Sequence, residues 1–346
     1  HLRHDGKARG VLRTGEYGAD EQRSQRGCRG DRMRRYLRGG ALAMKIVVAG
    51  GTGFLGRHIT RSLLDAGHAV TVLARDPSSV ARIRALDGAD AGRADVTDPG
   101  SLAGSMTGVD AVVGAIGFPN YPMEQPRKGR TFHRYEVDVT RNLLTEARAA
   151  GVARYLYLSG AGSTPTSPKP WYRAKGLAEE QIKRSGLRYC LVRPSWAYGP
   201  EDKALNKFVA IARFSPVVPM PAPIGRPQQV QPVYVGDIAT AVKRIFETDA
   251  AWNETIEIGS RDIWTMHDVV QTVCEVLGRK RMILSVPAPL LKLATAPLVV
   301  LPKPPLTPGA VDFAVQDGLV DIDAAERLLG FVPLPLEEGL ARYLAA

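Results

Sequence analysis

Three regularly spaced glycines point most clearly to chemistry in this sequence. Gly50, Gly53 and Gly56 form a GxxGxxG pattern between a short β-branched run and a stretch with helical periodicity. Glycines at such a turn let a pyrophosphate approach the peptide N–H groups at the start of the helix. A tight turn without a ligand is the alternative, but the flanking strand and helix favour a dinucleotide site. The loop residues predicted to bind the dinucleotide are Gly50, Thr52, Gly53, Phe54, Leu55 and Gly56.

The end of the second predicted strand indicates which dinucleotide is bound. An acidic residue there usually binds the ribose 2′-hydroxyl, whereas an arginine accommodates a 2′-phosphate. The chain has Arg75 at this position and Asp76 directly after it. Arg75 predicts a preference for NADP(H) over NAD(H). In the alternative, Asp76 binds the ribose while Arg75 lies on the adenine. Asp95 and Val96, after the third strand, are expected at the adenine edge.

Alternating strands and helices must position these residues. Five segments from Lys45 onward are typical of buried strands, and helical segments that end at glycines lie between them. Repetition of this β-α-β unit predicts the α/β class, with a doubly wound parallel Rossmann sheet and a smaller C-terminal α/β cap. The predicted strands include residues 45–49, 68–73, 111–113, 155–158 and 189–192.

The chain is predicted to divide into three parts. Residues 1–43 hold eleven Lys and Arg against five acids, so +6 of the net charge of +11 lies there. Few large apolar residues and no periodicity predict a disordered extension, most simply a non-native one. A targeting peptide and a basic arm for nucleic acid or membrane are the alternatives. Residues 44–200 are predicted to form the NAD(P)-binding domain, and 201–346 a smaller substrate or partner domain, with 229–260 returning to the Rossmann sheet.

Other functional classes lack support in the sequence. The three cysteines are widely spaced and the six histidines show no ligand spacing, so no metal site is predicted. No transmembrane helix is expected, because the apolar stretches near the C-terminus are too short. With most of the basic excess in the extension, we expect no nucleic-acid partner.

Several motifs in order carry a family resemblance. The loop 50–56, the turn Ala115-Ile116-Gly117 and the run from Arg193-Pro194 to Gly199-Pro200 resemble an extended or atypical short-chain dehydrogenase/reductase. Segments 199–208 and 231–237 are similar to the branch that contains the nucleotide-binding accessory subunit of respiratory complex I and its bacterial relatives. The resemblance covers the chain after Met44. It implies that Ala115, Gly117 and Pro194 also contact the cofactor.

The resemblance also implies a catalytic set, which this chain matches only in part. In the family, a tyrosine four residues before a lysine exchanges a proton with the substrate, and the lysine lowers its pKa and holds the nicotinamide ribose. Lys175 takes the lysine position, but Trp171 stands four residues earlier and Tyr172 is one residue late. Ser159 is the candidate serine, and Gly160 replaces the second serine of the usual pair.

Two functional interpretations follow. In the favoured one, the protein binds NADP(H) with a degenerate catalytic centre, and Trp171 covers the nicotinamide or fills the substrate site. In the alternative, Tyr172 with Ser159 or Ser163 serves an NADPH-dependent oxidoreductase or epimerase that acts on a small carbonyl, quinone or sugar-nucleotide substrate.

Contacts with larger partners are predicted near the C-terminus. The apolar stretch 287–305 is either core or a docking patch for a protein complex or a peripheral membrane contact. The expected location is the cytoplasm, with a peripheral position on the inner membrane as the alternative.

Overall fold

The computed structural model describes residues 43–84, 86–119, 123–297 and 306–344. All of the predicted disordered extension except Ala43, and part of the apolar stretch 287–305, therefore lie outside the described residues. The described residues from Lys45 onward belong to one compact unit.

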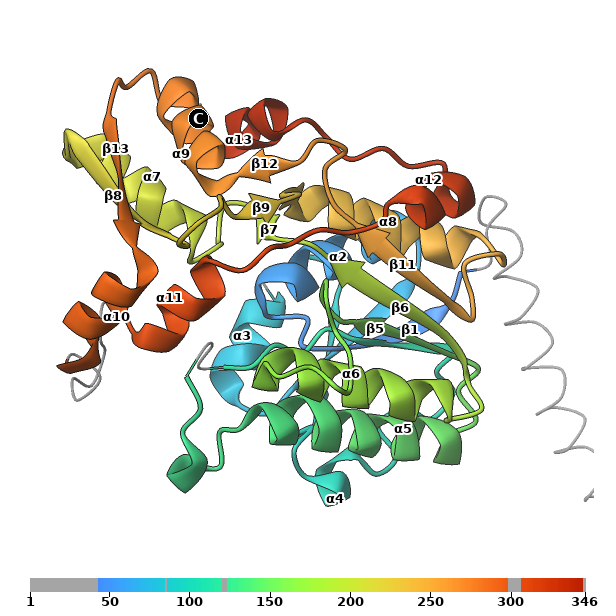
Figure 1. Cartoon of the computed structure of the whole chain (residues 1–346). Coiled ribbons are helices and arrows are strands. Elements are labelled where there is room, and N and C mark those ends of the chain that lie inside the picture. Colours follow the sequence, from blue (N-terminus) through green and yellow to red (C-terminus); the bar gives the residue numbers. More distant parts are fainter. Residues whose placement is uncertain (1–42, 85, 120–122, 298–305, 345–346) are drawn as a thin grey trace, which may run out of the picture. The chain divides into compact units, whose positions relative to one another are not determined.

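Seven parallel strands form the central sheet, in the order β11-β6-β5-β4-β1-β2-β3 (Figure 1). Since the order reverses beside β1, the chain winds outward in both directions, which confirms the predicted doubly wound Rossmann sheet. The middle strands are almost wholly buried and rich in Val, Ile and Leu, as strands covered on both faces must be. The strands are β1 (Lys45–Ala49), β2 (Ala69–Ala74), β3 (Asp90–Arg93), β4 (Ala111–Gly114), β5 (Arg154–Leu158), β6 (Arg188–Pro194) and β11 (Glu254–Ile258).

Helices cover both faces of this sheet. α2 and α8 pack together on one face, and α5 and α6 lie on the other (Figure 1). In α2 the buried residues recur at helical spacing, and the chain turns back after the helix at Gly67, whose φ of 86° suits glycine. The helices of this part are α2 (Phe54–Asp65), α3 (Pro77–Arg84), α4 (Pro99–Leu102), α5 (Val139–Ala149), α6 (Pro170–Lys183) and α8 (Val235–Glu247).

A π-helical turn precedes α5 directly. This turn, η2 (His133–Asp138), follows the short 3-10 helix η1 (Pro126–Lys128). It buries Glu136 and Val137 on the side that faces α6. π-Turns within helices are uncommon and often occur at functional sites, because the extra residue changes the direction of neighbouring side chains.

The C-terminal cap has its own hydrophobic core, formed mainly by α7, α9 and α13. Of the segment 229–260, β11 joins the edge of the seven-stranded sheet, whereas β9 and β10 pair with β12 and β7 in separate two-stranded sheets. The cap elements are β7 (Ala197–Tyr198), α7 (Leu205–Phe214), β8 (Val217–Ala222), β9 (Gln229–Val230), β10 (Val233–Tyr234), β12 (Trp264–Thr265), α9 (Met266–Val276), β13 (Met282–Pro287), α10 (Ala288–Thr295), α11 (Pro308–Ala314), α12 (Asp323–Leu329) and α13 (Leu336–Leu344).

Among the described residues, none of the helices combines the length and the apolar character needed to cross a bilayer.

Candidate dinucleotide site

The glycine-rich loop packs tightly against the turn that follows β4. A Cβ atom at Gly50, whose φ is 89°, would lie 2.5 Å from the Ala115 carbonyl oxygen. A Cβ at Gly56 would collide with the carbonyl oxygen of Gly50, and the amide of Gly53 donates to the same oxygen over 2.9 Å. The loop therefore has room only for glycine at these positions. This cradle of bare backbone is what the close approach of a pyrophosphate requires.

The N-terminus of α2 is open to an anion. Gly53 caps the helix without a side-chain hydrogen bond, and the first turn contains no acidic residue. The first N–H groups of a helix have no acceptor within the helix, so this end carries a partial positive charge. The residues Thr52 to Gly56 thus have a geometry that a pyrophosphate would fit.

Arg57 and Glu201, which the sequence analysis did not single out, brace this loop. The Arg57 guanidinium donates to the carbonyl oxygens of Gly53 and Thr52, over 3.2 and 3.3 Å. It also pairs with Glu201 at 3.2 Å, and His58 lies 3.0 Å from the same carboxylate. In the sequence, only the position of Arg57 directly after the third glycine could have indicated this contact. Through Arg57 and Glu201, the glycine loop is connected to the chain that follows β7.

Arg75 and Asp76 follow β2 with different surroundings. The Arg75 side chain is 57% exposed, and its Nε lies 3.5 Å from the Asp76 carboxylate. Asp76 accepts hydrogen bonds from the Ser78 hydroxyl and from the amide and hydroxyl of Ser79. The bond from Ser78 is the main reason that the pKa of Asp76 falls to about 2. The Asp76 carboxylate is therefore occupied by hydrogen bonds at the start of α3, while the Arg75 side chain is largely exposed to solvent.

The other predicted cofactor residues lie at the carboxyl ends of neighbouring parallel strands. Asp95 follows β3 and accepts hydrogen bonds from the amide and hydroxyl of Thr97. The Val96 carbonyl oxygen accepts from Asn142 over 3.1 Å. Ala115, Gly117 and Pro194 belong to the ends of β4 and β6, and a Cβ at Gly117 would meet nothing within 4 Å. Since the strands are parallel, all of these positions share one edge with the glycine loop.

Lys175 is held by a buried carboxylate. Its Nζ donates to Glu136 Oε2 over 3.1 Å and to the Leu158 carbonyl oxygen over 3.1 Å. The Tyr157 hydroxyl donates to the same Glu136 oxygen over 2.5 Å, and burial raises the pKa of Tyr157 well above its usual value. The Glu136 side chain is 4% exposed and that of Lys175 is 21% exposed. An ion pair with little solvent around it thus lies at Lys175, the residue that the sequence resemblance assigned as the lysine of the catalytic set.

The serine position lies in a loop that turns inward. Ser159 is buried and donates its hydroxyl to Ser163 over 3.2 Å, and Ser163 donates to the Gly160 carbonyl oxygen over 2.7 Å. A Cβ at Gly160 would lie 3.8 Å from Cδ of Lys175. Position 160, which faces the lysine stem, therefore carries no hydroxyl.

Aromatic packing surrounds Trp171. Its ring lies against Phe132, Tyr172 and Phe313, with centroids 6.1, 5.9 and 6.2 Å apart. The Tyr172 ring approaches Gly162, and burial raises the pKa of its phenol. The tyrosine of an active member needs the opposite shift. Phe313, on α11, shows that the C-terminal cap contributes to this cluster.

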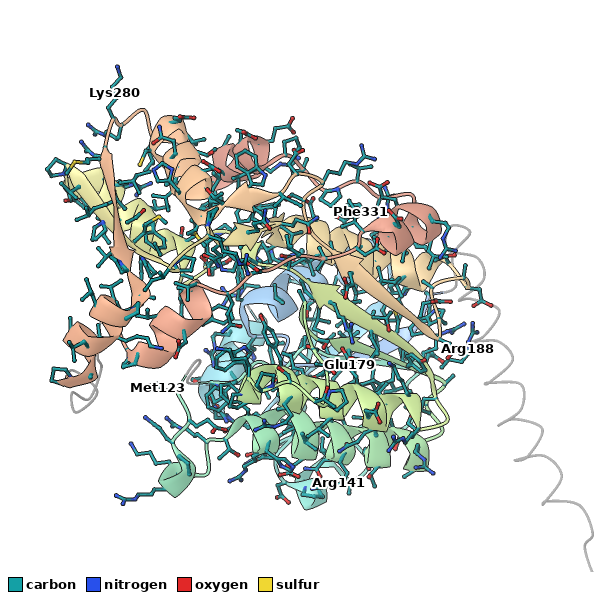
Figure 2. All side chains as sticks on the ribbon, in the orientation of Figure 1. Met123, Arg141, Glu179, Arg188, Lys280 and Phe331 are labelled. Atoms are coloured by element: carbon teal, nitrogen blue, oxygen red, sulfur yellow. The ribbon has the colours of Figure 1, made fainter. Side chains whose placement is uncertain are left out.

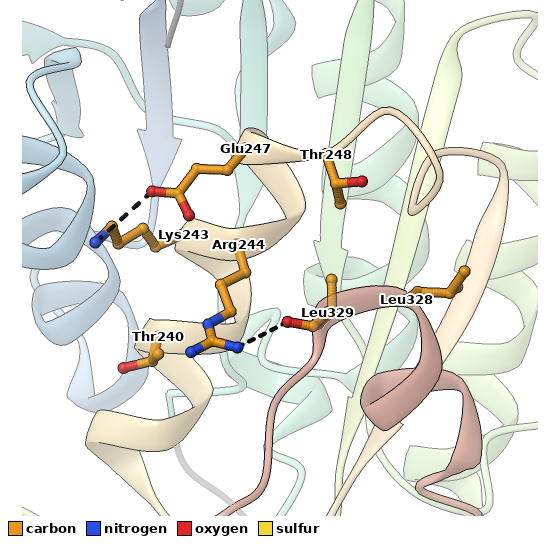
Figure 3. Close-up of a pocket in the computed structure, with 7 residues that line it drawn as sticks. All are labelled: Thr240, Lys243, Arg244, Glu247, Thr248, Leu328 and Leu329. Carbon is orange, nitrogen blue, oxygen red and sulfur yellow. Dashed lines mark hydrogen bonds and ion pairs between the residues drawn. The ribbon is translucent and has the colours of Figure 1, made fainter. Parts of the chain in front are cut away.

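A cavity of about 450 Å³ lies elsewhere, between α8 and α12 (Figure 3). Arg244 donates to the carbonyl oxygens of Leu329 and Gly330 at the end of α12, and Lys243 pairs with Glu247 at 3.7 Å. None of the predicted site residues lines this cavity. Its charged side chains secure α12 to α8.

Comparisons with known proteins agree with this geometry. Residues 50–213 match the family described as NAD(P)H-binding. The chain is 28% identical over 269 residues to the mitochondrial NADH dehydrogenase [ubiquinone] 1 alpha subcomplex subunit 9 of Arabidopsis thaliana, covering 75% of this chain and 65% of that protein. It therefore spans slightly less than two thirds of that relative. It is 26% identical to the ceramide reductase of Caulobacter vibrioides, covering 70% and 74% of the two chains.

A solved structure confirms the fold. The NADPH-dependent quinone oxidoreductase QOR2 of Escherichia coli, complexed with NADPH, superposes with a TM-score of 0.68. The match covers 86% of this chain and 99% of that one at 22% sequence identity.

Proposed function

We propose that this chain, whose residues 50–213 match an NAD(P)H-binding family, binds NADP(H) without ordinary dehydrogenase turnover. In this role the bound dinucleotide stabilises the protein, as in an accessory subunit of a respiratory complex. The Arabidopsis relative is named as a subunit of a mitochondrial NADH dehydrogenase.

The pairing of Lys175 with Glu136 carries this proposal. A lysine can lower the pKa of a nearby phenol only through an uncompensated positive charge. Here a buried carboxylate compensates that charge at 3.1 Å. The candidate phenol, Tyr172, has a raised pKa, and Trp171 fills the expected tyrosine position with packed aromatic surface. These features favour binding over proton transfer.

A titration with NADPH tests the proposal. We expect NADPH to raise the melting temperature with the logarithm of its free concentration, because it binds the folded state. Absorbance at the reduced-nicotinamide band should stay constant when aldehydes, ketones or quinones are added. Tyr172→Phe should behave like the wild type, and Trp171→Tyr should add at most trace activity. A reproducible oxidation of NADPH that Tyr172→Phe removes would show that the protein is an enzyme.

The alternative is an active oxidoreductase or epimerase. It is favoured by the contact between the Tyr172 ring and Gly162, within the loop that carries Ser159 and Ser163. A small carbonyl, a quinone or a sugar nucleotide would then be the substrate. The names of the Caulobacter and Escherichia coli proteins, a ceramide reductase and a quinone oxidoreductase, place carbonyl and quinone chemistry on related chains. The titration above separates the two functions.

We propose NADPH rather than NADH as the preferred dinucleotide. Arg75 projects free of the sheet, whereas three hydrogen bonds engage the Asp76 carboxylate that would otherwise accept from a ribose hydroxyl. A guanidinium matches a phosphate in charge and geometry.

An exposed apolar surface along β13 and α10 is the proposed contact with a membrane. Met282 and Leu284 face outward while Ile283 packs on the cap core, and Leu290 and Leu293 are 60% and 75% exposed on α10. Exposed basic side chains lie at one end of it, since Arg279 and Lys280 stand just before Arg281 and the start of β13, and Lys280 points away from the chain (Figure 2). Apolar side chains beside basic ones suit an anionic lipid surface. The protein would then lie at the inner membrane, alone or within a complex.

Cosedimentation with lipid vesicles tests this contact. We expect binding to anionic vesicles, weak binding to neutral ones, and about a tenfold loss for the double variant Leu290→Gln/Leu293→Gln, which removes two apolar anchors. Ile263→Gln is the matched control, because Ile263 is also exposed (57%) but lies before β12. If the wild-type protein stays in the supernatant with anionic vesicles, this surface does not bind a membrane, and a partner protein is then the expected contact.

A further inference from the structure

Glu136 stands out because the chain buries an acid beside Lys175. The side chain comes from the π-turn η2, is 4% exposed, and reaches the lysine that in this family holds the nicotinamide ribose. One oxygen, Oε2, accepts both hydrogen bonds, from Tyr157 and from Lys175. A buried carboxylate costs free energy unless it is paired, so its position there requires the lysine and the phenol together.

The pair makes this part of the site electrically neutral. Oxidised nicotinamide carries a positive charge and reduced nicotinamide does not. An unpaired Lys175 would repel the oxidised ring and would leave the reduced ring unaffected. With Glu136 beside it, the lysine still has a proton for a ribose hydroxyl, because it donates one to Glu136 and one to Leu158.

We infer that Glu136 determines the redox-state preference of the site: by neutralising Lys175 it lets the protein hold NADP⁺ nearly as well as NADPH. This inference rests on the proposed binding of NADP(H). It deepens that proposal by naming the residue that sets the preference between the oxidised and the reduced dinucleotide. Glu136 acts through Lys175 and is therefore a positioning residue.

Two substitutions of opposite charge test the inference by calorimetric titration at pH 8. Glu136→Gln keeps an oxygen that can accept both hydrogen bonds but leaves Lys175 unpaired. We expect the ratio of the dissociation constants, NADP⁺ over NADPH, to rise about fivefold or more, the scale of one charge acting through partly solvated protein. Lys175→Met leaves the negative carboxylate, so the ratio should move in the opposite direction. The double variant Glu136→Gln/Lys175→Met removes both charges and should return the ratio close to the wild-type value.

A matched control separates charge from packing. Glu179 is also a buried acid in an ion pair, with Arg193, and it lies one helical turn after Lys175 on α6 (Figure 2). Glu179→Gln should lower stability and leave the ratio unchanged. If the two charge variants weaken both ligands equally, or shift the ratio in the same direction, the inference is wrong. If the wild type binds neither NADP⁺ nor NADPH, the proposed function itself fails.

Discussion

Replacing Arg75 by alanine is expected to weaken NADPH binding by about ten- to a hundredfold, because a charged hydrogen bond contributes about 1.5–3 kcal/mol. NADH binding should change by less than about twofold, since the two dinucleotides differ only at the 2′-phosphate. Fluorescence titration of both reduced dinucleotides against the wild type and Arg75→Ala measures this difference. Arg75→Lys should fall between them, because an ammonium keeps the charge and loses the paired donors.

The structure also supplies a control for the competing assignment. If Asp76 bound the ribose hydroxyls of NADH, Asp76→Asn would weaken NADH specifically. We expect it to lower stability instead, since the carboxylate accepts from Ser78 and Ser79 at the start of α3. Arg148→Ala controls for the loss of positive charge, because Arg148 lies in the last turn of α5 and the glycine loop lies at the opposite edge of the sheet. Equal affinities for NADPH and NADH in the wild type would contradict the preference.

Local signals made the fold and the phosphate loop predictable. The glycines at 50, 53 and 56 indicate both the turn and its close packing. A Cβ atom at Gly50 or Gly56 would collide with neighbouring backbone atoms. The β-branched runs read correctly as strands, since a strand buried on both faces needs such residues over a short segment. The match of residues 50–213 to an NAD(P)H-binding family agrees with these local signals.

The interactions that decide the chemistry were less accessible to sequence reasoning. Glu136 meets Lys175 only because a π-turn rotates it toward α6, and nothing in the surrounding sequence marks that turn. Phe313 reaches Trp171 from the C-terminal cap, so the packing of that ring depends on tertiary structure. The one-residue offset of Tyr172 was visible in the sequence. Its consequence, a phenol with a raised pKa, required the burial seen in the fold.

Asp237 should give the protein a distinct pH dependence of stability. It lies in the first turn of α8, is 7% exposed, and accepts a hydrogen bond from the Leu334 amide over 2.8 Å. Burial raises the pKa of Asp237 from 3.8 to about 6, against the opposing effects of that hydrogen bond and of Arg342. Among the described residues, Tyr198 and Tyr234 also interact electrostatically with Asp237. The Asp237 carboxyl group therefore connects the cap segment before α13 to the Rossmann domain. Ionisation of this buried group lowers the free energy of unfolding.

The sign of this dependence follows from linkage. Between pH 3.8 and about 6 the folded state retains a proton that the unfolded state has released, so this group lowers stability as the pH rises through that window. Asp237→Asn keeps an acceptor for Leu334 and cannot ionise. The difference in free energy of unfolding between Asp237→Asn and the wild type should therefore change by about 2–3 kcal/mol in favour of the variant from pH 4 to pH 7. One pKa unit corresponds to about 1.4 kcal/mol. Urea unfolding across this range measures the gain.

Asp76→Asn is the matched control for this titration, because the pKa of Asp76 is shifted in the opposite direction, from 3.8 to about 2. The stabilising effect of the wild-type Asp76 carboxylate is complete above pH 3.8 and is lost as the pH falls toward 2. The difference between Asp76→Asn and the wild type should therefore stay nearly constant from pH 5 to pH 8, where the Asp237→Asn difference still grows and then levels off. A pH-independent difference for Asp237→Asn would mean that the pKa of Asp237 is the same in the folded and unfolded states, so that burial does not raise it.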